Sequence, residues 1–403
     1  MKKIEGGVCA AKGFRAGGIH CGIRAGRSKR DLALIASDVR AAAAAVFTTN
    51  KVCGAPVTVS RAHLADGCAQ AIICNSGNAN TCNANGIEIA HGMAELVERY
   101  TGIPAADVLV ASTGVIGEQM TLEPMRAGMP ALMESLGAHH AEAEEAIMTT
   151  DTVPKEAAVE FALGGRTARI GGMAKGSGMI HPNMATMLAF ITTDAAISPE
   201  MLQKALSDDV SETFNMVSVD GDTSTNDTCA VLANGLAGNT PVTEEGADYD
   251  AFRAALREVT RSLAVMIARD GEGASKLLTC RVTGAKDERN ARIAARAVVS
   301  SNLVKAAMFG ADANWGREMC ALGYSGAELD VTKVSIAFAS RKGRVTVGEN
   351  GVGIVFSEEK AAEILGEDEI EILVTLCDGD AGATAWGCDL TYEYVRINGD
   401  YRT

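Results

Sequence analysis

Glycine content is the feature that most restricts how this chain can fold. The 403-residue sequence contains 43 glycines, whereas Phe, Trp and Tyr together make up only 4% of it. Glycine is favoured where the backbone turns tightly or where two segments approach closely. We therefore expect many turns and an interior filled largely by small side chains. With 47% hydrophobic residues, the chain still has enough apolar surface for two or three domains.

The net charge argues against polyanionic partners. Lys and Arg number 37 and Asp and Glu number 51, so the formal charge is 37 − 51 = −14. A strongly acidic protein is repelled by phosphate backbones and by anionic lipid. The longest alanine-rich run, at residues 41–47, is far shorter than the roughly 20 apolar residues of a membrane span, and residues 1–7 contain no apolar signal segment. We expect a cytoplasmic protein that binds neither nucleic acid nor membranes.

Cysteine and histidine do not occur in metal-binding patterns. The eleven cysteines include no C-x-x-C pair, so we expect free thiols in a reducing compartment rather than zinc sites or disulfides. The carboxylates of Asp220, Asp222 and Asp227 could hold a divalent cation. In stretches rich in Ser, Thr and Asn, however, such side chains more often cap turns. The sequence therefore predicts no metal and no bound cofactor.

Short strand-like runs alternate with amphipathic helices, which predicts a mixed α/β fold. Helical spacing of apolar residues occurs at 89–100 and at 252–266, the latter with Asp250 placed to cap its start. A third helix is predicted from Pro199 to about residue 214, because Ser198-Pro199-Glu200 is a typical helix start. A surface loop is expected at 235–246, and a second domain from about 279–288. Strands are predicted at residues 71–74, 108–111, 167–170, 187–191, 216–219, 277–282, 334–338, 344–347, 370–376 and 390–397.

The stretch from 173 to 194 is the most informative for chemistry. A glycine-rich loop ends in Pro-Asn-Met-Ala, and Thr186 follows at the start of an apolar run. A threonine there is, in general, an ordinary strand residue. The alternative is an N-terminal nucleophile. If the Ala185–Thr186 bond is cut, Thr186 gains a free α-amine with a reference pKa of about 7.7–8.0, and that amine can act as the base for the threonine hydroxyl.

The same hydroxyl can make the cut. Thr186 Oγ attacks the carbonyl of Ala185, the acyl group moves from nitrogen to oxygen, and water hydrolyses the ester. Such a shift requires a distorted backbone, which the Gly-Ser-Gly sequence at 176–178 allows.

Residues 175–180 (KGSGMI) and 182–188 (PNMATML) resemble the glutamate N-acetyltransferase / ornithine acetyltransferase family of arginine biosynthesis. Seven other segments also resemble family segments, in family order, so the resemblance covers essentially the whole chain. They are 13–18 (GFRAGG), 75–80 (NSGNAN), 112–117 (STGVIG), 149–152 (TTDT), 220–227 (DGDTSTND), 270–274 (DGEGA) and 310–317 (GADANWGR).

The resemblance implies a self-cleaving transferase made of an α chain, 1–185, and a β chain, 186–403. The two chains would stay associated, as a heterotetramer of two α and two β chains. Thr186 would take the acetyl group from N-acetyl-L-ornithine, release L-ornithine and pass the acetyl group to L-glutamate. The implied fold is a layered α/β sandwich with a smaller C-terminal α/β domain at about 280–390, and with residues 391–403 returning to the active site.

The resemblance also implies roles for particular residues. Thr113 and Gly114 match the positions of the oxyanion hole, although by themselves they are typical of a Ser-Thr-Gly turn. From the residues alone, Lys175 could equally be a solvated loop charge, Glu272 an exposed residue after a helix, and 398–403 a frayed chain end. The matched substrate-binding positions are Thr152, Lys175, Thr186, Glu272, Asn398 and Thr403.

Two questions stay open at this point. Some members of the family also accept acetyl-CoA as a co-substrate, and no residue here decides whether this chain does. The reaction class has alternatives as well: a self-activating amidohydrolase or aminopeptidase whose acyl-enzyme reacts with water, or an unprocessed α/β protein without catalysis.

Overall fold

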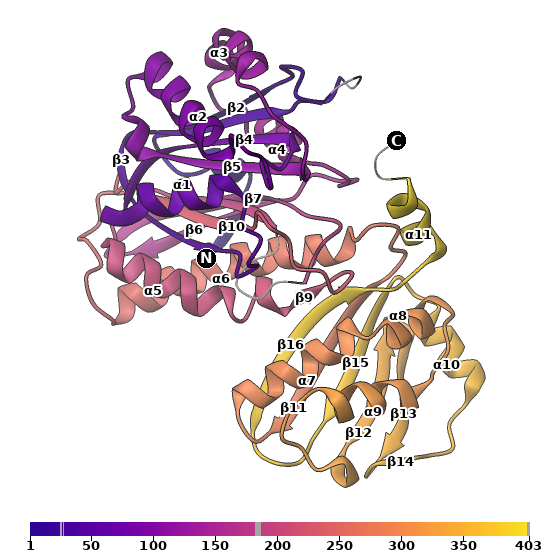
Figure 1. Cartoon of the computed structure of the whole chain (residues 1–403). Coiled ribbons are helices and arrows are strands. Elements are labelled where there is room, and N and C mark those ends of the chain that lie inside the picture. The colour runs from indigo at the N-terminus through magenta and orange to yellow at the C-terminus, as the bar shows by residue number, and fades with distance from the viewer. Residues whose placement is uncertain (25, 27, 182–186, 401–403) are drawn as a thin grey trace. The chain divides into compact units, whose positions relative to one another are not determined.

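The computed structural model describes residues 1–24, 26, 28–181 and 187–400. The chain forms two compact units (Figure 1). The first comprises residues 1–176, 183–211 and 223–263, and the second comprises 177–182, 212–222 and 264–403.

In the first unit, nine strands of the described chain form one mixed sheet in the order β1-β6-β7-β8-β10-β3-β4-β5, with β2 paired to β3. The β8–β10 and β4–β5 pairs are parallel, whereas the other pairs are antiparallel. The bounds are β1 (Lys2–Ile4), β2 (Phe14–Ile19), β3 (Leu32–Phe47), β4 (Cys68–Asn78), β5 (Val108–Val115), β6 (Glu156–Leu163), β7 (Arg166–Lys175), β8 (Leu188–Thr193) and β10 (Thr228–Ala233).

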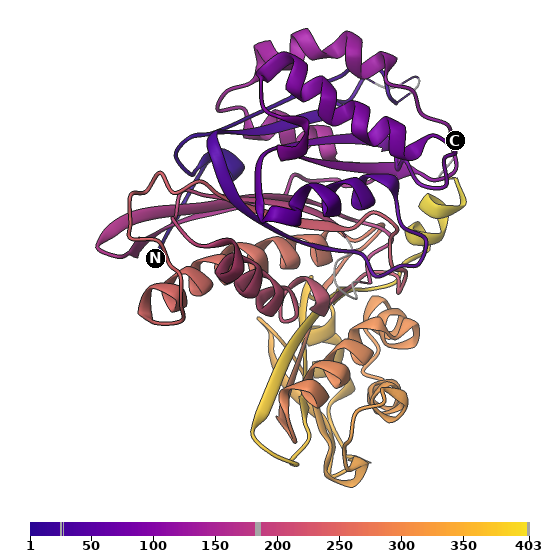
Figure 2. The same cartoon turned by 60° about the vertical axis from the view of Figure 1, so that its left-hand side comes forward.

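Helices cover this sheet in layers. Figures 1 and 2 show α2 and α3 on one side of the strands and α5 and α6 on the other. The bounds are α1 (Ala55–His63), α2 (Gly86–Thr101), α3 (Glu123–Ser135), α4 (His140–Ile147), α5 (Pro199–Val210) and α6 (Ala247–Arg269), whose last residues belong to the second unit. The layered α/β sandwich expected from the sequence is confirmed.

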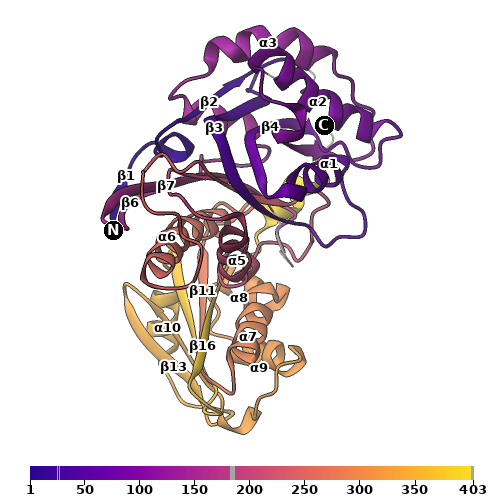
Figure 3. The ribbon, with the colours of Figure 1, turned by 90° about the vertical axis from the view of Figure 1, so that its left-hand side faces the viewer.

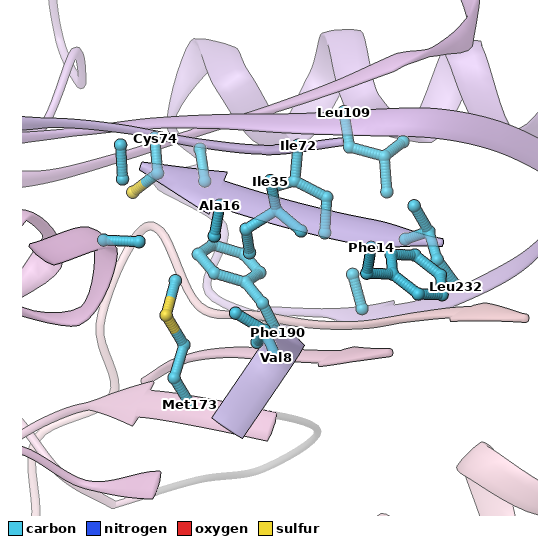
Figure 4. Close-up of a cluster of buried hydrophobic side chains, with 14 of the residues drawn as sticks. Val8, Phe14, Ala16, Ile35, Ile72, Cys74, Leu109, Met173, Phe190 and Leu232 are labelled. Carbon is cyan, nitrogen blue, oxygen red and sulfur yellow. The ribbon is translucent and has the colours of Figure 1, made fainter. Parts of the chain in front are cut away.

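The sheet folds over so that its own faces enclose a core. Figure 4 shows Ile35, Ile72 and Leu109, from β3, β4 and β5, directed towards Phe190 of β8 and Met173 of β7. Alternate side chains of a strand point to opposite faces, so the neighbouring residues of β3 and β4 pack instead with α2 and α3. Many members of the central cluster are alanines, as the glycine-rich, aromatic-poor sequence predicts.

The second unit contains a smaller mixed sheet in the order β14-β13-β12-β15-β11-β16-β9. Figure 3 shows α7 along β11 and β16, and α10 packs against β12 and β13. The strand bounds are β9 (Val217–Ser218), β11 (Leu277–Ala285), β12 (Ser335–Ser340), β13 (Gly343–Glu349), β14 (Val352–Gly353), β15 (Glu369–Thr375) and β16 (Ala381–Cys388). The helix bounds are α7 (Glu288–Ser300), α8 (Asn302–Phe309), α9 (Trp315–Tyr324), α10 (Glu358–Leu365) and α11 (Tyr392–Gly399).

Most predicted elements are confirmed, with shifted ends. The helix α5 begins at Pro199, and the hydroxyl of Ser198 caps it by accepting the Met201 N–H at 3.3 Å. The helix α6 begins at Ala247, so Asp250 lies in its first turn and not at its N-cap. None of the helices in the described chain combines the length and apolarity that crossing a bilayer requires.

The strand predicted at 390–397 is wrong, because this segment is the helix α11. Thr391 caps the helix by accepting the Glu393 N–H at 3.2 Å, and Glu393 pairs with Arg396 one turn later. The local pattern of β-branched and aromatic residues suggested a strand, but capping and the side-chain pair favour a helix.

Candidate active site

Three residues of the predicted site, Ala185, Thr186 and Thr403, lie outside the described residues, and their roles stay predictions. The described chain resumes at Met187, whose carbonyl accepts the Thr228 N–H at 2.9 Å. The strand β8 begins at the next residue, Leu188. The residue that follows the predicted nucleophile therefore lies between the strands that carry Lys175 and Thr228.

Lys175 is brought to this point by the register of the sheet. Lys175 is the last residue of β7 and pairs with Leu188, which pairs on its other side with Thr228 of β10. Lys175 is only 8% exposed, so the alternative of a solvated loop charge is excluded. Lys175 is eleven residues before Thr186 in the sequence, but backbone pairing places it directly beside the first residue of β8.

Asp151 holds the segment around Lys175 in place. Its Oδ1 accepts a bond from Lys155 Nζ at 2.8 Å and the Gly176 N–H at 2.7 Å, and its Oδ2 accepts the Thr149 N–H at 3.0 Å. Burial acts to raise the pKa of Asp151, but the positive charges of Lys175 and Lys155 outweigh it and lower the pKa to about 2. Asp151 is therefore an ionised, fully buried anchor.

Thr152, the other predicted contact of this region, is the neighbour of Asp151 and is exposed. The carboxylate of Asp151 thus fixes the backbone beside both Thr152 and Lys175. Asp151 lies in one of the segments that resemble the family, but no role was predicted for it. The spacing of Asp151 and Lys155, four residues apart in a stretch that forms no helix, was the one local signal of the buried pair.

A second buried carboxyl group lies near Lys175. Burial raises the pKa of Asp227 well above its usual value, although the charge of Lys175 and a hydrogen bond with Ser224 act to lower it. Its Oδ2 has no hydrogen-bond partner among the described residues. The pKa of Asp151 is thus lowered and that of Asp227 raised, although the charge of Lys175 acts on both, and perturbed carboxyl groups of this kind are often found at functional sites. The hydrogen bond with Ser224, three residues earlier, is consistent with the local role expected for this acidic cluster.

The predicted oxyanion-hole residues, Thr113 and Gly114, are not in a turn but in β5, which extends to Val115. Gly114 pairs with Gly77 of β4 and has a φ of +132°. A Cβ on Gly114 would lie 2.3 Å from the carbonyl carbon of Gly77. Both the backbone conformation and the close approach therefore require glycine here.

In the second unit, the structure brings Glu272 and Asn398 together. Asn398 Nδ2, on α11, donates to Glu272 Oε2 at 2.7 Å. The Glu272 side chain is held beside the glycine-rich loop, since the Glu272 N–H donates to Ser177 O at 2.9 Å. A Cβ on Gly178 would lie 2.3 Å from the Glu272 carboxyl carbon. Glu272 is only 6% exposed, which excludes the alternative of a solvated residue after a helix.

Asp220 holds the segment just before the predicted cleavage site. Its carboxylate accepts the Met179 N–H at 2.6 Å and the Ile180 N–H at 2.9 Å. Its Oδ1 also accepts the Asp222 N–H at 3.2 Å, which is the turn-capping role expected of this aspartate. Met179 has a φ of +56°, an unfavourable value for a side chain of its size. The imidazole of His181 lies 3.0 Å from Ser218 Oγ. Burial and the charge of Arg296 lower the pKa of His181 to about 4, so this residue is neutral at physiological pH.

Comparison with known proteins identifies the family. The model of the ArgJ family matches residues 15–403. The chain belongs to the ArgJ family. The family predicted from the sequence, and with it the class of acyltransferase in arginine biosynthesis, is thereby confirmed.

Relatives in the ArgJ family match over the full length. The arginine biosynthesis bifunctional protein ArgJ of Caldanaerobacter subterraneus subsp. tengcongensis is 51% identical, with 100% of both chains covered. That of Bacillus subtilis is 47% identical over 100% of this chain and 98% of its own. A crystal structure of the Bacillus halodurans ArgJ protein aligns with a TM-score of 0.51 and 49% identity, and it covers 53% of this chain and 99% of its own.

Among the described residues, no group of three or more His, Cys, Asp or Glu side chains is placed to hold a metal ion. All eleven cysteines are unpaired.

Proposed function

We propose that this chain transfers an acetyl group from N-acetyl-L-ornithine to L-glutamate through an acetyl ester on Thr186. The match to the ArgJ family across residues 15–403 is the observation that carries this proposal. The geometry of the described residues supports it. Lys175 is a buried cation suited to the carboxylate of an amino acid, and Glu272 with Asn398 is a buried anion suited to an ammonium group.

The reaction begins with self-cleavage between Ala185 and Thr186. The α-amine that is released takes the proton of Thr186 Oγ as the oxygen attacks the acetyl carbonyl of N-acetylornithine. The resulting oxyanion is stabilised by donors from Thr113 and Gly114. When the C–N bond breaks, the proton passes to the amine of ornithine. Glutamate then attacks the acetyl ester by the reverse sequence, which gives N-acetylglutamate and restores the threonine.

The size of the solved relative supports cleavage. The Bacillus halodurans chain covers 53% of this chain, and 99% of its own length is matched. This share agrees with that of the proposed β chain, because residues 186–403 make up 218/403, or 54%, of the sequence. A denaturing gel of the purified protein tests the cut. Scaling 41.8 kDa by 185/403 and 218/403 predicts fragments of about 19 and 23 kDa. Thr186→Ala is expected to stay as one intact band.

An assay of product formation separates transfer from hydrolysis. The cleaved protein is incubated with N-acetylornithine, with and without glutamate, while ornithine and N-acetylglutamate are measured. Transfer predicts that ornithine release depends on glutamate and matches N-acetylglutamate formation. Ornithine release at the same rate without glutamate would instead indicate the amidohydrolase or aminopeptidase alternative.

We also propose that acetyl-CoA serves as a second acetyl donor, as a co-substrate and not as a bound cofactor. The relatives reported above are named bifunctional proteins of arginine biosynthesis, which favours two activities. N-acetylglutamate formation with acetyl-CoA as the sole donor is the expected result. Its absence in an enzyme that is active with N-acetylornithine would contradict this part alone.

The proposed assembly is a heterotetramer of two α and two β chains, located in the cytoplasm. Eleven free thiols are consistent with a reducing compartment. Light scattering of the cleaved protein is expected to give about 84 kDa, twice 41.8 kDa.

A further inference from the structure

The backbone just before the oxyanion-hole residues is held by a side chain from a distant segment. Asn226 Nδ2 donates to the carbonyl of Ser112 at 3.0 Å and to the carbonyl of Ala79 at 2.5 Å. The Ser112 carbonyl and the Thr113 N–H belong to one planar peptide group. A hydrogen bond to this carbonyl therefore fixes the plane from which Thr113 projects.

The amide of Asn226 is itself held at its other end. Its Oδ1 accepts hydrogen bonds from Thr81 Oγ1 at 2.6 Å and from Thr225 Oγ1 at 2.5 Å. Asn226 is only 5% exposed, and both of its donors and its acceptor are used. Because two hydroxyl groups point their protons at Oδ1 and two carbonyls face Nδ2, the orientation of the amide is determined by its partners.

Asn226 acts at an irregular point of the sheet. The β4–β5 register shifts between Gly77 and Asn78, so that Asn78 pairs with both Thr113 and Val115. Ala79 follows this bulge on one strand, and Ser112 precedes it on the other. A bulge re-aims the backbone but loses regular ladder bonds. The two bonds from Asn226 add a side-chain link between the two strand ends on either side of this irregular point.

We propose that Asn226 is a positioning residue for the oxyanion hole, which keeps Thr113 and Gly114 aimed at the reacting carbonyl. The inference rests on the proposed acetyl transfer. It concerns a side chain that does not touch the substrate and acts through the Ser112–Thr113 peptide. Loss of this support lowers the stabilisation of the transition state and leaves binding of the ground state largely unchanged.

The test replaces Asn226 by aspartate in the full chain. Asn226→Asp keeps the shape but removes both N–H donors, so that a carboxylate oxygen faces the carbonyls of Ala79 and Ser112. We expect kcat per cleaved chain to fall by about 10- to 100-fold. This fall should be no larger than the fall caused by removing a group that donates directly to the oxyanion. The KM for N-acetylornithine is expected to stay within about threefold of the wild-type value.

Asn234 provides a matched control. It is also buried in the first unit, and its Nδ2 donates to Lys12 O at 2.8 Å and to Ser37 Oγ at 3.2 Å, groups that do not contact Ser112. Asn234→Asp is expected to lower the melting temperature at least as much as Asn226→Asp but to leave kcat within about threefold of wild type. An equal loss of kcat in the two variants would show that Asn226 has only a structural role.

A second variant avoids a buried charge. Thr81→Val keeps the shape of the side chain but removes the hydroxyl that fixes Asn226 Oδ1, and should lower kcat by about three- to tenfold at constant KM. If Asn226→Asp does not fold, this variant decides the question. An unchanged kcat in Thr81→Val would then overturn the proposal.

The outcomes also separate this inference from the proposed function. If the wild-type enzyme forms no N-acetylglutamate, the acetyl-transfer proposal itself fails. If wild type is active and Asn226→Asp keeps its kcat, the inference fails alone. A folded Asn226→Asp protein that does not cleave would also overturn the inference, because Asn226 would then be required before the acetyl-transfer step.

Discussion

In the first unit, the buried charge of Asp151 both pairs with a lysine and holds the backbone beside Lys175. The Lys155–Asp151 pair is completely buried, with both side chains 0% exposed. The same carboxylate anchors the Gly176 N–H, directly after Lys175. A buried pair of this kind is costly to break, because removing one partner leaves the other charged and without its counter-ion in a medium that solvates it poorly.

Asp151→Asn should therefore lower the free energy of unfolding by about 3–5 kcal/mol. The chain offers a matched control in Lys204–Asp208, a pair with the same four-residue spacing whose side chains are 44% and 45% exposed. Asp208→Asn should cost less than about 1 kcal/mol. Urea unfolding of both variants in the uncleaved Thr186→Ala background measures the difference. Equal costs for the two variants would contradict the buried anchor.

Glu144 gives a prediction that depends on pH. This residue of α4 is buried, and its Oε1 has no partner among the described residues. Burial, and secondly the charge of Glu156, raise the pKa of Glu144 to about 8. A raised carboxyl pKa contributes stability below the unfolded value of about 4.5, and this contribution is lost as the pH rises towards 8.

Glu144→Gln should therefore become more stable than wild type as the pH rises. We expect the difference in unfolding free energy to grow by about 1–3 kcal/mol between pH 5 and pH 8. Glu134→Gln, at an exposed position of α3, should show a constant difference from wild type. A difference for Glu144→Gln that shrinks with rising pH would show that the carboxyl group is ionised in the folded protein.

Individual site residues were predictable where the resemblance to a known family assigned a role to the matching position. Lys175 and Glu272 were found because each lies in a glycine-rich segment that resembles a known family. Asp151 and Asn226 were given no role, because their partners at Gly176 and Ser112 are 25 and 114 residues away. A residue that acts on a distant backbone group leaves no local pattern in one sequence.

At the scale of elements, α11 is the helix on which the substrate-binding proposal depends most. It has no buried residues of its own. It is held at its start, where Thr391 Oγ1 donates to Gly273 O at 2.6 Å and accepts the Glu393 N–H at 3.2 Å. A Cβ on Gly273 would lie 2.6 Å from the Tyr394 nitrogen, so the helix lies directly on this loop. One hydroxyl thus caps the helix and ties it to the residue next to Glu272.

Thr391→Ala should loosen α11 and so weaken the contact of Asn398 with Glu272. We expect the KM for N-acetylornithine to rise several-fold, while stability falls by about 1 kcal/mol through the lost cap. Ser357 caps α10 in the same way, by accepting the Lys360 N–H at 3.1 Å. Ser357→Ala should lose similar stability without a change in KM. Thr391→Ser, which keeps the hydroxyl, is expected to restore the wild-type KM.

The same helix marks the limit of secondary-structure prediction here. Long periodic segments such as α2 and α6 were predicted correctly, because their apolar faces follow the helical period over many residues. The segment of α11 is short and exposed, so it has no apolar period to follow, and its β-branched residues indicated a strand. Only the cap at Thr391 and the pairing of Glu393 with Arg396 distinguish it.

At the scale of the whole molecule, the position of the predicted cut relative to the strands of the first sheet determines how the two fragments would be held together. The strands β7 and β3 precede residue 186, whereas β8 and β10 follow it. Backbone pairing joins β7 to β8 and β10 to β3, each over six residue pairs. Cleavage would leave these ladders intact, so the two fragments would share one sheet and one core.

The cleaved fragments should therefore separate only when the sheet itself unfolds. In increasing urea, we expect size-exclusion chromatography to show dissociation at the same midpoint at which circular dichroism shows loss of secondary structure. Thr186→Ala, which is expected to stay uncut, is the control, because this chain can unfold and change its elution volume but cannot dissociate into two fragments. Fragments that separate well below the unfolding midpoint would contradict a shared core.

The place of β8 between β7 and β10 has a consequence for how the enzyme is made. Under the proposed cleavage, the threonine becomes reactive only beside strands contributed by distant parts of the chain. If that proposal holds, the newly synthesised chain would be inactive, and it would become active only once the central sheet has formed. A chain that misfolds would then lack the reactive N-terminal threonine and could not transfer acetyl groups, so cleavage would restrict activity to correctly folded enzyme.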